Sequence, residues 1–397
     1  MVVGDRASWW ALFAHAVLVQ ALSYGLRSSV SYEFLGLGLG GSWLGYSAAA
    51  FALPPLLLAI PSGVLVRRCG ERFVLVVGAL FFLLSVLLLG VGRDQALVLL
   101  LASSLIGCGV LFSVVAEQAW VMKKAAKHRL DFTFGMYTFA TSGGQMLGPL
   151  MLMLPAYAAF EHGVFAEARS LGGVSLVLSL LLVAFSAVIR SEKTQVNAQV
   201  NAHGDPASVT RSTGLLRQRG IISALFVSSV VLTSLDLVIV YVPLLADELG
   251  LPVAAASALL VVRGAVTMLS RLLLSVFTAR VGRRAALMIG CLFAGVGLAC
   301  FAVVPVVWLL MIAIAVYGLA AGVVQPLTMS WMTLVTTPEQ RPVAAALRLV
   351  GNRVGQTTLP LAASFLAGFG GATMVFALMA TLLTCSAVTA RQAPNDR

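Results

Sequence analysis

Polar and ionisable side chains interrupt the apolar runs of this sequence at helical spacing. Gln20, Tyr24 and Arg27 follow one another at i, i+4 and i+7, which places them on one face of a predicted helix. A charged side chain at mid-membrane costs about 3 kcal/mol even on insertion scales, so it faces a protein interior or a water-filled cavity. This face is therefore a candidate site for a substrate or a coupling ion. Arg27 also has a simpler interpretation, as a side chain that reaches to the outer membrane surface.

A second polar face repeats this spacing later in the chain. Ser229, Thr233 and Asp236 again fall at i, i+4 and i+7, and Asp236 stands 212 positions after Tyr24. Arg263 lies near the middle of the next apolar run. We predict either a permanent ion pair between Asp236 and Arg263, or a proton-carrying Asp236 from which an arriving substrate draws Arg263 away.

Glu117 is the other acidic residue well inside an apolar run, within two turns of its end. It is predicted either to gate the pathway by pairing with a basic loop or to carry a proton. His15 lies off the polar face of its run and is interpreted as a packed histidine. The remaining candidates for substrate or ion contact are Gln325, Asn352 and Arg353.

Enzyme chemistry finds no support in the motifs. The sequence has no nucleophile elbow, paired carboxylates, metal-ligand spacing or dinucleotide fingerprint, and no phosphate-binding loop ahead of a soluble domain. We expect no enzyme activity, no metal and no cofactor. The net charge of +11 comes without a basic stripe interleaved with aromatic residues, so nucleic-acid binding is not expected either.

Composition indicates an all-α membrane protein. Hydrophobic residues make up 60% of the chain and charged residues only 10%, against about 25% charged in soluble domains. About 20 apolar residues cross a bilayer as a helix, and strand alternation is absent. Twelve spans are predicted at 8–33, 42–66, 73–92, 95–121, 133–158, 167–189, 220–245, 251–279, 285–306, 307–335, 343–368 and 370–390.

Basic residues set the predicted orientation. One set of alternate loops carries most of the Lys and Arg residues, whereas the opposite loops hold only Arg93 and Arg169. Because positive loops stay in the cytoplasm, both termini are predicted to be cytoplasmic. The polar stretch 191–219 is predicted to be a flexible cytoplasmic linker between an N-terminal six-helix half, 1–190, and a C-terminal six-helix half, 220–397.

An internal repeat supports two pseudo-symmetric halves. Basic, glycine-containing loops centred on Gly70 and Gly282 are 212 positions apart, and Trp120 precedes Trp331 by 211. The first loop contains Gly63, Arg67, Arg68, Gly70 and Arg72, and the second contains Arg280, Gly282, Arg283 and Arg284. Gly144-Gln145 likewise precedes Gly355-Gln356 by 211 positions. Such duplication is typical of transporters that rock two halves about a central site.

The first loop resembles the signature G-x-L-x-D-R-x-G-R-R/K of the major facilitator superfamily. Arg67 takes the aspartate position of that signature and Glu71 the position of an arginine. The charges are thus permuted, and a cytoplasmic ionic latch with altered partners is expected. The resemblance, which covers nearly the whole chain, implies that helices 1, 4, 7 and 10 line the cavity.

Within that family the chain looks most similar to drug/proton antiporters. Their fifth helix carries G-x-x-x-G-P-x-x-G-G, of which Gly144, Gly148 and Pro149 are present while the last two glycines are not. Ser103 stands where their fourth helix often has an arginine, so the proton, if one is used, needs another carrier.

We therefore expect a monomeric secondary transporter in a bacterial inner membrane that exports a small organic molecule by proton antiport. If the charges of Asp236 and Arg263 cancel, the other charged residues inside the spans leave a modestly positive interior, which favours anionic or zwitterionic cargo. The alternatives are proton-coupled import of an organic anion and, with less support, a sensor that transports nothing.

Overall fold

The computed structural model describes residues 3–92, 94–124, 130–153, 164–189, 216–218, 220–336 and 341–394. Every regular element within these ranges is helical, as the composition predicts. Nine helices among the described residues are long and apolar enough to cross a membrane. The exact number of twelve spans stays a prediction. The predicted linker 191–219 lies almost entirely outside the described ranges.

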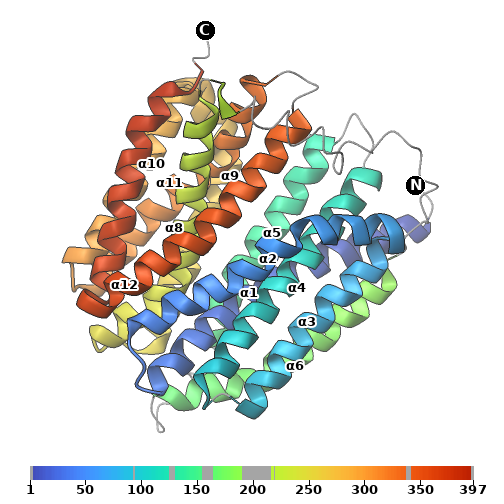
Figure 1. The fold of residues 1–397 in the computed structure, drawn as a ribbon, viewed down its shortest axis with the longest axis vertical. Helices are drawn as coiled ribbons and strands as arrows, with labels where there is room; N and C mark the ends of the chain where they lie inside the picture. Colours follow the sequence, from blue (N-terminus) through green and yellow to red (C-terminus); the bar gives the residue numbers. More distant parts are fainter. Residues whose placement is uncertain are drawn as a thin grey trace. The chain divides into compact units, whose positions relative to one another are not determined.

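The helices differ from the predicted spans mainly at their ends. Figure 1 shows α1 (Val3–Gly36), α2 (Gly41–Cys69), α3 (Glu71–Gly92), α4 (Ala96–Lys124), α5 (Leu130–Met153), α6 (Val164–Val188), α8 (Ile221–Glu248), α9 (Val253–Val281), α10 (Arg283–Val303), α11 (Val307–Leu334) and α12 (Arg341–Thr389). The backbone of α12 leaves the helical conformation at Gly370 and Gly371, and Gly371 has a φ of 61°. This break falls at the predicted boundary between the last two spans.

The chain forms two compact units. Unit 1 comprises Met1–Thr194 with Ile239–Ala265, and unit 2 comprises Gln195–Val238 with Val266–Arg397. The ends of α8 and α9 that meet at their connecting turn thus belong to unit 1, whereas the remainder of both helices belongs to unit 2. Within unit 1, α1 packs on α4, α5 and α6. Within unit 2, α10 packs on α11 and α12.

Glycine allows α1 and α5 to approach closely. A Cβ atom added at Gly148 would lie 2.6 Å from the carbonyl oxygen of Ala21 and 2.8 Å from the backbone nitrogen of Gly25. Small residues that let backbones meet are the usual means of helix association in membranes, because lipid provides no hydrophobic drive between apolar helices. The glycine signature of the fifth helix therefore has a packing role in α5.

The repeated glycines make matching contacts in the two units. A Cβ at Gly78 of α3 would lie 3.1 Å from the carbonyl oxygen of Gly109 in α4, and a Cβ at Gly290 of α10 would lie 3.3 Å from that of Ala320 in α11. The two loop glycines also share one conformation: φ is 84° at Gly70 and 82° at Gly282. Positive φ is strained for other residues, so this conformation explains why both loops carry glycine.

Glu71, the acid that takes an arginine position of the loop signature, is paired with a lysine. Glu71 is the first residue of α3 and is nearly buried, and its Oε1 lies 3.4 Å from Nζ of Lys123 in the last turn of α4. A carboxylate at a helix N-terminus is further stabilised by the helix dipole. The loop between α2 and α3 is thereby connected to α4 through Glu71.

Candidate functional site

The polar residues on one face of α1 contact two different helices of unit 1, α5 and α2. Gln20 Oε1 accepts a hydrogen bond from Nε2 of Gln145 on α5 at 3.4 Å. Tyr24 is nearly buried against Gly148 of α5. Arg27, 5% exposed, instead places its guanidinium 4.0 Å from the ring centroid of Phe51 on α2. Arg27 is therefore packed inside the unit, which does not fit a side chain that reaches to the membrane surface.

Arg263 is the most deeply buried cation described in unit 1. Its side chain is 1% exposed, and its Cζ lies 5.2 Å from the ring centroid of Tyr24. A cation over an aromatic face gains about 2 kcal/mol or more when desolvated. Nε and Nη2 of Arg263 have no hydrogen-bond partner among the described residues. Donors left unpaired at such depth can receive an anionic oxygen.

In unit 2, Asp236, Gln356 and Arg353 are linked in series. Gln356 Nε2 donates to Oδ2 of Asp236, and Arg353 Nη1 donates to Oε1 of Gln356 at 3.1 Å. Gln356 is the neighbour of Gly355, whose missing side chain brings α12 close to α8: a Cβ there would lie 3.2 Å from that of Ser229. A neutral amide thus connects an acid on α8 with a base on α12.

Two further predicted residues lie near this series. Gln325 on α11 donates through Nε2 to the carbonyl oxygen of Ser228 at 3.3 Å, and its Oε1 accepts from Nη2 of Arg348 at 3.5 Å. Asn352, 4% exposed, keeps an Oδ1 without a hydrogen-bond partner within the described part of the chain. The predicted candidates Asp236, Gln325, Asn352 and Arg353 thus all belong to unit 2.

Asp236 and Arg263 belong to different units, so their pairing stays a prediction. The hydrogen bonds of Glu117 within the described residues go to His15 and Tyr137, whereas residues 125–129 of the basic loop predicted to pair with it lie outside those residues. Sequence reasoning missed these two partners. His15 and Glu117 are 102 positions apart, so no local spacing could connect them.

Ser103, which replaces the arginine of the antiporter pattern, has a packing role. Its side chain is 2% exposed, and its Oγ lies 2.8 Å from that of Ser47 on α2. It also donates to the carbonyl oxygen of Leu99 at 3.0 Å. This contact between α2 and α4 leaves no ionisable group at the position.

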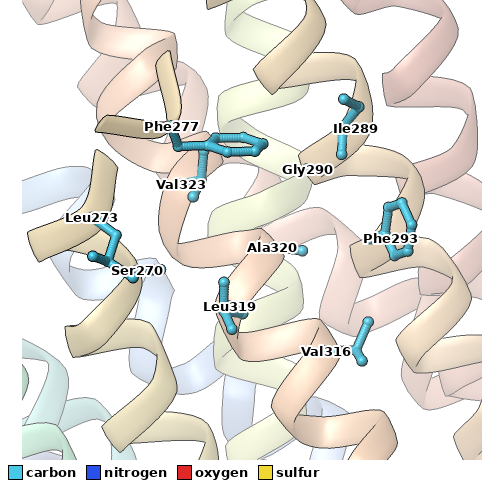
Figure 2. A pocket seen from close by; sticks show the side chains of 10 residues that line it. All are labelled: Ser270, Leu273, Phe277, Ile289, Gly290, Phe293, Val316, Leu319, Ala320 and Val323. Carbon is cyan, nitrogen blue, oxygen red and sulfur yellow. The ribbon is translucent and has the colours of Figure 1, made fainter. Parts of the chain in front are cut away.

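A cavity of about 370 Å³ opens between α9, α10 and α11 in unit 2 (Figure 2). Phe277, Phe293 and Leu319 give it an apolar wall, and its single hydroxyl, on Ser270, donates to the carbonyl oxygen of Thr267 at 2.8 Å. None of the predicted site residues lines it. Recognition of a polar substrate by this cavity has no basis in its side chains.

Metal binding also has no basis in the described residues, among which no three His, Cys, Asp or Glu side chains converge. The groups that remain for chemistry are arginine donors, amides, the half-buried carboxylate of Asp236 and the buried carboxylates of Glu71 and Glu117. Such groups bind and orient polar or charged solutes and exchange protons.

Comparisons with known proteins identify a family and relatives for this chain. The family model of the Major Facilitator Superfamily matches residues 11–269 and 224–395. Multidrug resistance protein 2 of Bacillus subtilis (strain 168) is 27% identical over 148 residues, and Quinolone resistance protein NorA of Staphylococcus aureus (strain Mu50) is 26% identical over 147. Each alignment covers 37% of this chain and 37% of the relative.

The fold is similar to solved structures over nearly its whole length. A crystal structure of a mutant of the nucleoside transporter NupG superposes with a TM-score of 0.79 at 14% identity, covering 96% of this chain and 98% of that one. A second NupG structure gives a TM-score of 0.73. Similarity at this level of identity concerns the fold alone. With helices of membrane-spanning length, buried ionisable groups and a family match along the chain, this multi-pass membrane protein is a transporter, not an enzyme, and belongs to the major facilitator superfamily.

Proposed function

We propose that this transporter exports a small organic molecule with an anionic or zwitterionic group, by proton antiport across a bacterial inner membrane. The observation that carries the proposal is Arg263, which is 1% exposed, lies over Tyr24 and has two unpaired donors. A substrate carboxylate that accepts from Nε and Nη2 would pair the buried charge. Bidentate arginine–carboxylate contacts are among the stronger hydrogen bonds in proteins.

Unit 2 has a separate set of polar groups that would suit a charged solute. Asp236, joined through Gln356 to Arg353, offers a carboxylate for an ammonium group, and Asn352 Oδ1 offers a further acceptor. An acid and a base held apart by an amide suit a zwitterion better than a simple cation. The relatives' names, which refer to multidrug and quinolone resistance, favour a drug-like cargo.

The architecture we propose has two six-helix halves, 1–190 and 220–397, with both termini and the connecting linker in the cytoplasm. Support comes from the matching conformations of Gly70 and Gly282 and from the matching contacts of Gly78 and Gly290. Alternating access by rocking of such halves is the usual mechanism of repeat-built transporters.

Drug accumulation in cells tests the proposal. In a bacterium without its own major efflux pumps, expression of this chain should lower the steady-state content of ciprofloxacin, a zwitterionic quinolone, several-fold relative to an empty vector. The Arg263→Gln variant should lose this effect, because it removes the buried guanidinium. The Arg391→Gln variant is the matched control, since Arg391 is exposed in the short helix Ala390–Gln392 and belongs to no predicted site.

The outcome also separates the alternatives. A higher ciprofloxacin content in expressing cells would contradict export and favour the runner-up, proton-coupled import of an organic anion. Unchanged content in the presence of well-expressed protein would contradict quinolone export. Equal activity of the wild-type protein and Arg263→Gln would remove Arg263 from the binding site.

A further inference from the structure

Four polar side chains from four helices meet inside unit 1. His15 of α1 and Glu117 of α4 are both 0% exposed, and His15 Nδ1 lies 2.6 Å from Oε1 of Glu117. Tyr137 of α5 donates its hydroxyl to Oε2 of the same carboxylate at 2.7 Å. Ser186 of α6 lies 2.9 Å from His15 Nε2 through its Oγ. An apolar cluster that includes Trp120 surrounds them.

The hydrogen bonds determine how many protons the His15–Glu117 pair holds. Ser186 Oγ donates to the carbonyl oxygen of Leu182 at 2.7 Å, so it accepts from Nε2–H of His15. One more proton is then shared between Nδ1 and Glu117 Oε1. Whichever of the two atoms holds it, the histidine and the carboxyl group together have no net charge.

The cluster can release one proton without losing its internal hydrogen bonds. If the Ser186 hydroxyl turns from Leu182 to His15 Nε2, it replaces the Nε2 proton as the donor in that hydrogen bond. Nδ1–H then donates to Glu117, whose other oxygen still accepts from Tyr137. A water molecule that reaches Nε2 when the transporter opens accepts this proton, and the net charge of the pair changes from zero to −1. Hydrogen bonds to the charged form are what make such a charge tolerable away from water.

The internal repeat has neither the histidine nor the acid of this cluster at the equivalent positions. At the offsets of 212 for the first helix and 211 for the fourth, His15 corresponds to Val227 and Glu117 to Thr328. Val227 and Thr328 are both 0% exposed, so the second copy packs these positions without an acid or a base. Because buried ion pairs are often no more stable than packed apolar residues, stability alone does not explain the pair.

We propose that His15 and Glu117 bind the coupling proton, and that Tyr137 and Ser186 position them. This inference deepens the proposed function and rests on it for the use made of the proton. The other charged side chains described on α1 to α4 are Arg27, Glu33, Arg67, Arg68, Glu71, Arg72, Lys123 and Lys124. Glu71 and Lys123 face each other, and Arg27 faces Phe51.

Nitrogen NMR of His15 tests the proton site without any substrate. The chain has 4 histidines, and replacing His128, His162 and His203 by glutamine leaves His15 alone. In this background, the labelled ring nitrogens should change reversibly between acidic and alkaline buffers that leave the protein folded, because release of the Nε2 proton changes the tautomer. Glu117→Gln should abolish that transition or displace it. Ring nitrogens that stay unchanged between these acidic and alkaline buffers would overturn the proposal.

Transport by a variant that copies the second repeat gives the second readout. The double variant His15→Val with Glu117→Thr introduces the residues of unit 2 and should fold. In proteoliposomes, its rate of ciprofloxacin uptake driven by a pH gradient should be about tenfold or more below the wild-type rate. Ser85→Ala, which removes a buried hydroxyl bonded to the carbonyl oxygen of Ala102, is the control. If the double variant does not fold, Glu117→Gln, which keeps the size of the side chain, takes its place.

The two readouts separate this inference from the proposed function. Uptake by the double variant within about twofold of the wild-type rate would overturn the proton site. If the wild-type protein moves no ciprofloxacin under a gradient, the proposed function fails, and the His15 titration still decides whether the pair binds an exchangeable proton.

Discussion

Replacing Gly148 by valine is expected to leave almost no folded transporter in the membrane. A Cβ at this position would lie 2.6 Å from the carbonyl oxygen of Ala21 and 2.8 Å from Cβ of Tyr24. The first of these atoms is backbone, so α1 and α5 must separate to admit the side chain. Overpacking of this kind costs about 1–3 kcal/mol, and more where backbones must move.

Gly143 provides a matched control on the same helix. A Cβ there would meet nothing within 4 Å, so Gly143→Val introduces the same side chain into open space. Size-exclusion profiles of detergent extracts should show a monodisperse peak for Gly143→Val and a lost or aggregated peak for Gly148→Val. Equal peaks from both variants would mean that α1 and α5 are not held by this contact.

Replacing Asp236 by asparagine should weaken ciprofloxacin binding by at least about tenfold, which corresponds to about 1.4 kcal/mol. The carboxylate accepts from Gln356, which also accepts from Arg353, so its loss leaves the arginine end of the series without its acid. A hydrogen bond to a charged group typically contributes about 1.5–3 kcal/mol. Asp247→Asn is the control, because Asp247 is exposed on the same helix.

The same variants decide between two roles for Asp236. If Asp236 contacts substrate and His15 holds the proton with Glu117, Asp236→Asn should weaken binding measured by tryptophan fluorescence and leave the His15 transition in place. An unchanged affinity combined with loss of gradient-driven uptake would make Asp236 the proton carrier. Equal affinities for Asp236→Asn, Asp247→Asn and the wild-type protein, with uptake retained, would remove Asp236 from the site.

Membrane class and the repeat were predictable because both depend on local composition and fixed offsets. The apolar runs predict helices of membrane-spanning length, and the offset of 212 predicts that Gly70 and Gly282 occupy equivalent turns, which their φ values confirm. The number of spans and their edges were less certain. The break at Gly371 within α12 shows how closely two helices can follow each other at a pair of glycines.

Candidate residues were predictable by type, but their partners were not. Depth in an apolar run correctly identified Arg263 and Glu117 as buried. Helical periodicity placed Gln20 and Arg27 on one face, yet it could not tell that they contact different helices. His15 is packed, as the sequence predicts, but its partners could not be predicted because they are far away in sequence. Its replacement by Val227 in the second repeat was the one signal that set it apart from the scaffold.

Transport by purified protein in liposomes tests the central claim most directly. Vesicles that are more acidic inside than outside should take up external ciprofloxacin against its gradient as protons leave, and collapsing the pH gradient with an ionophore should release it. Protein-free vesicles give the passive baseline. Uptake equal to that baseline, or uptake that occurs only when the pH gradient is reversed, would contradict a proton antiporter.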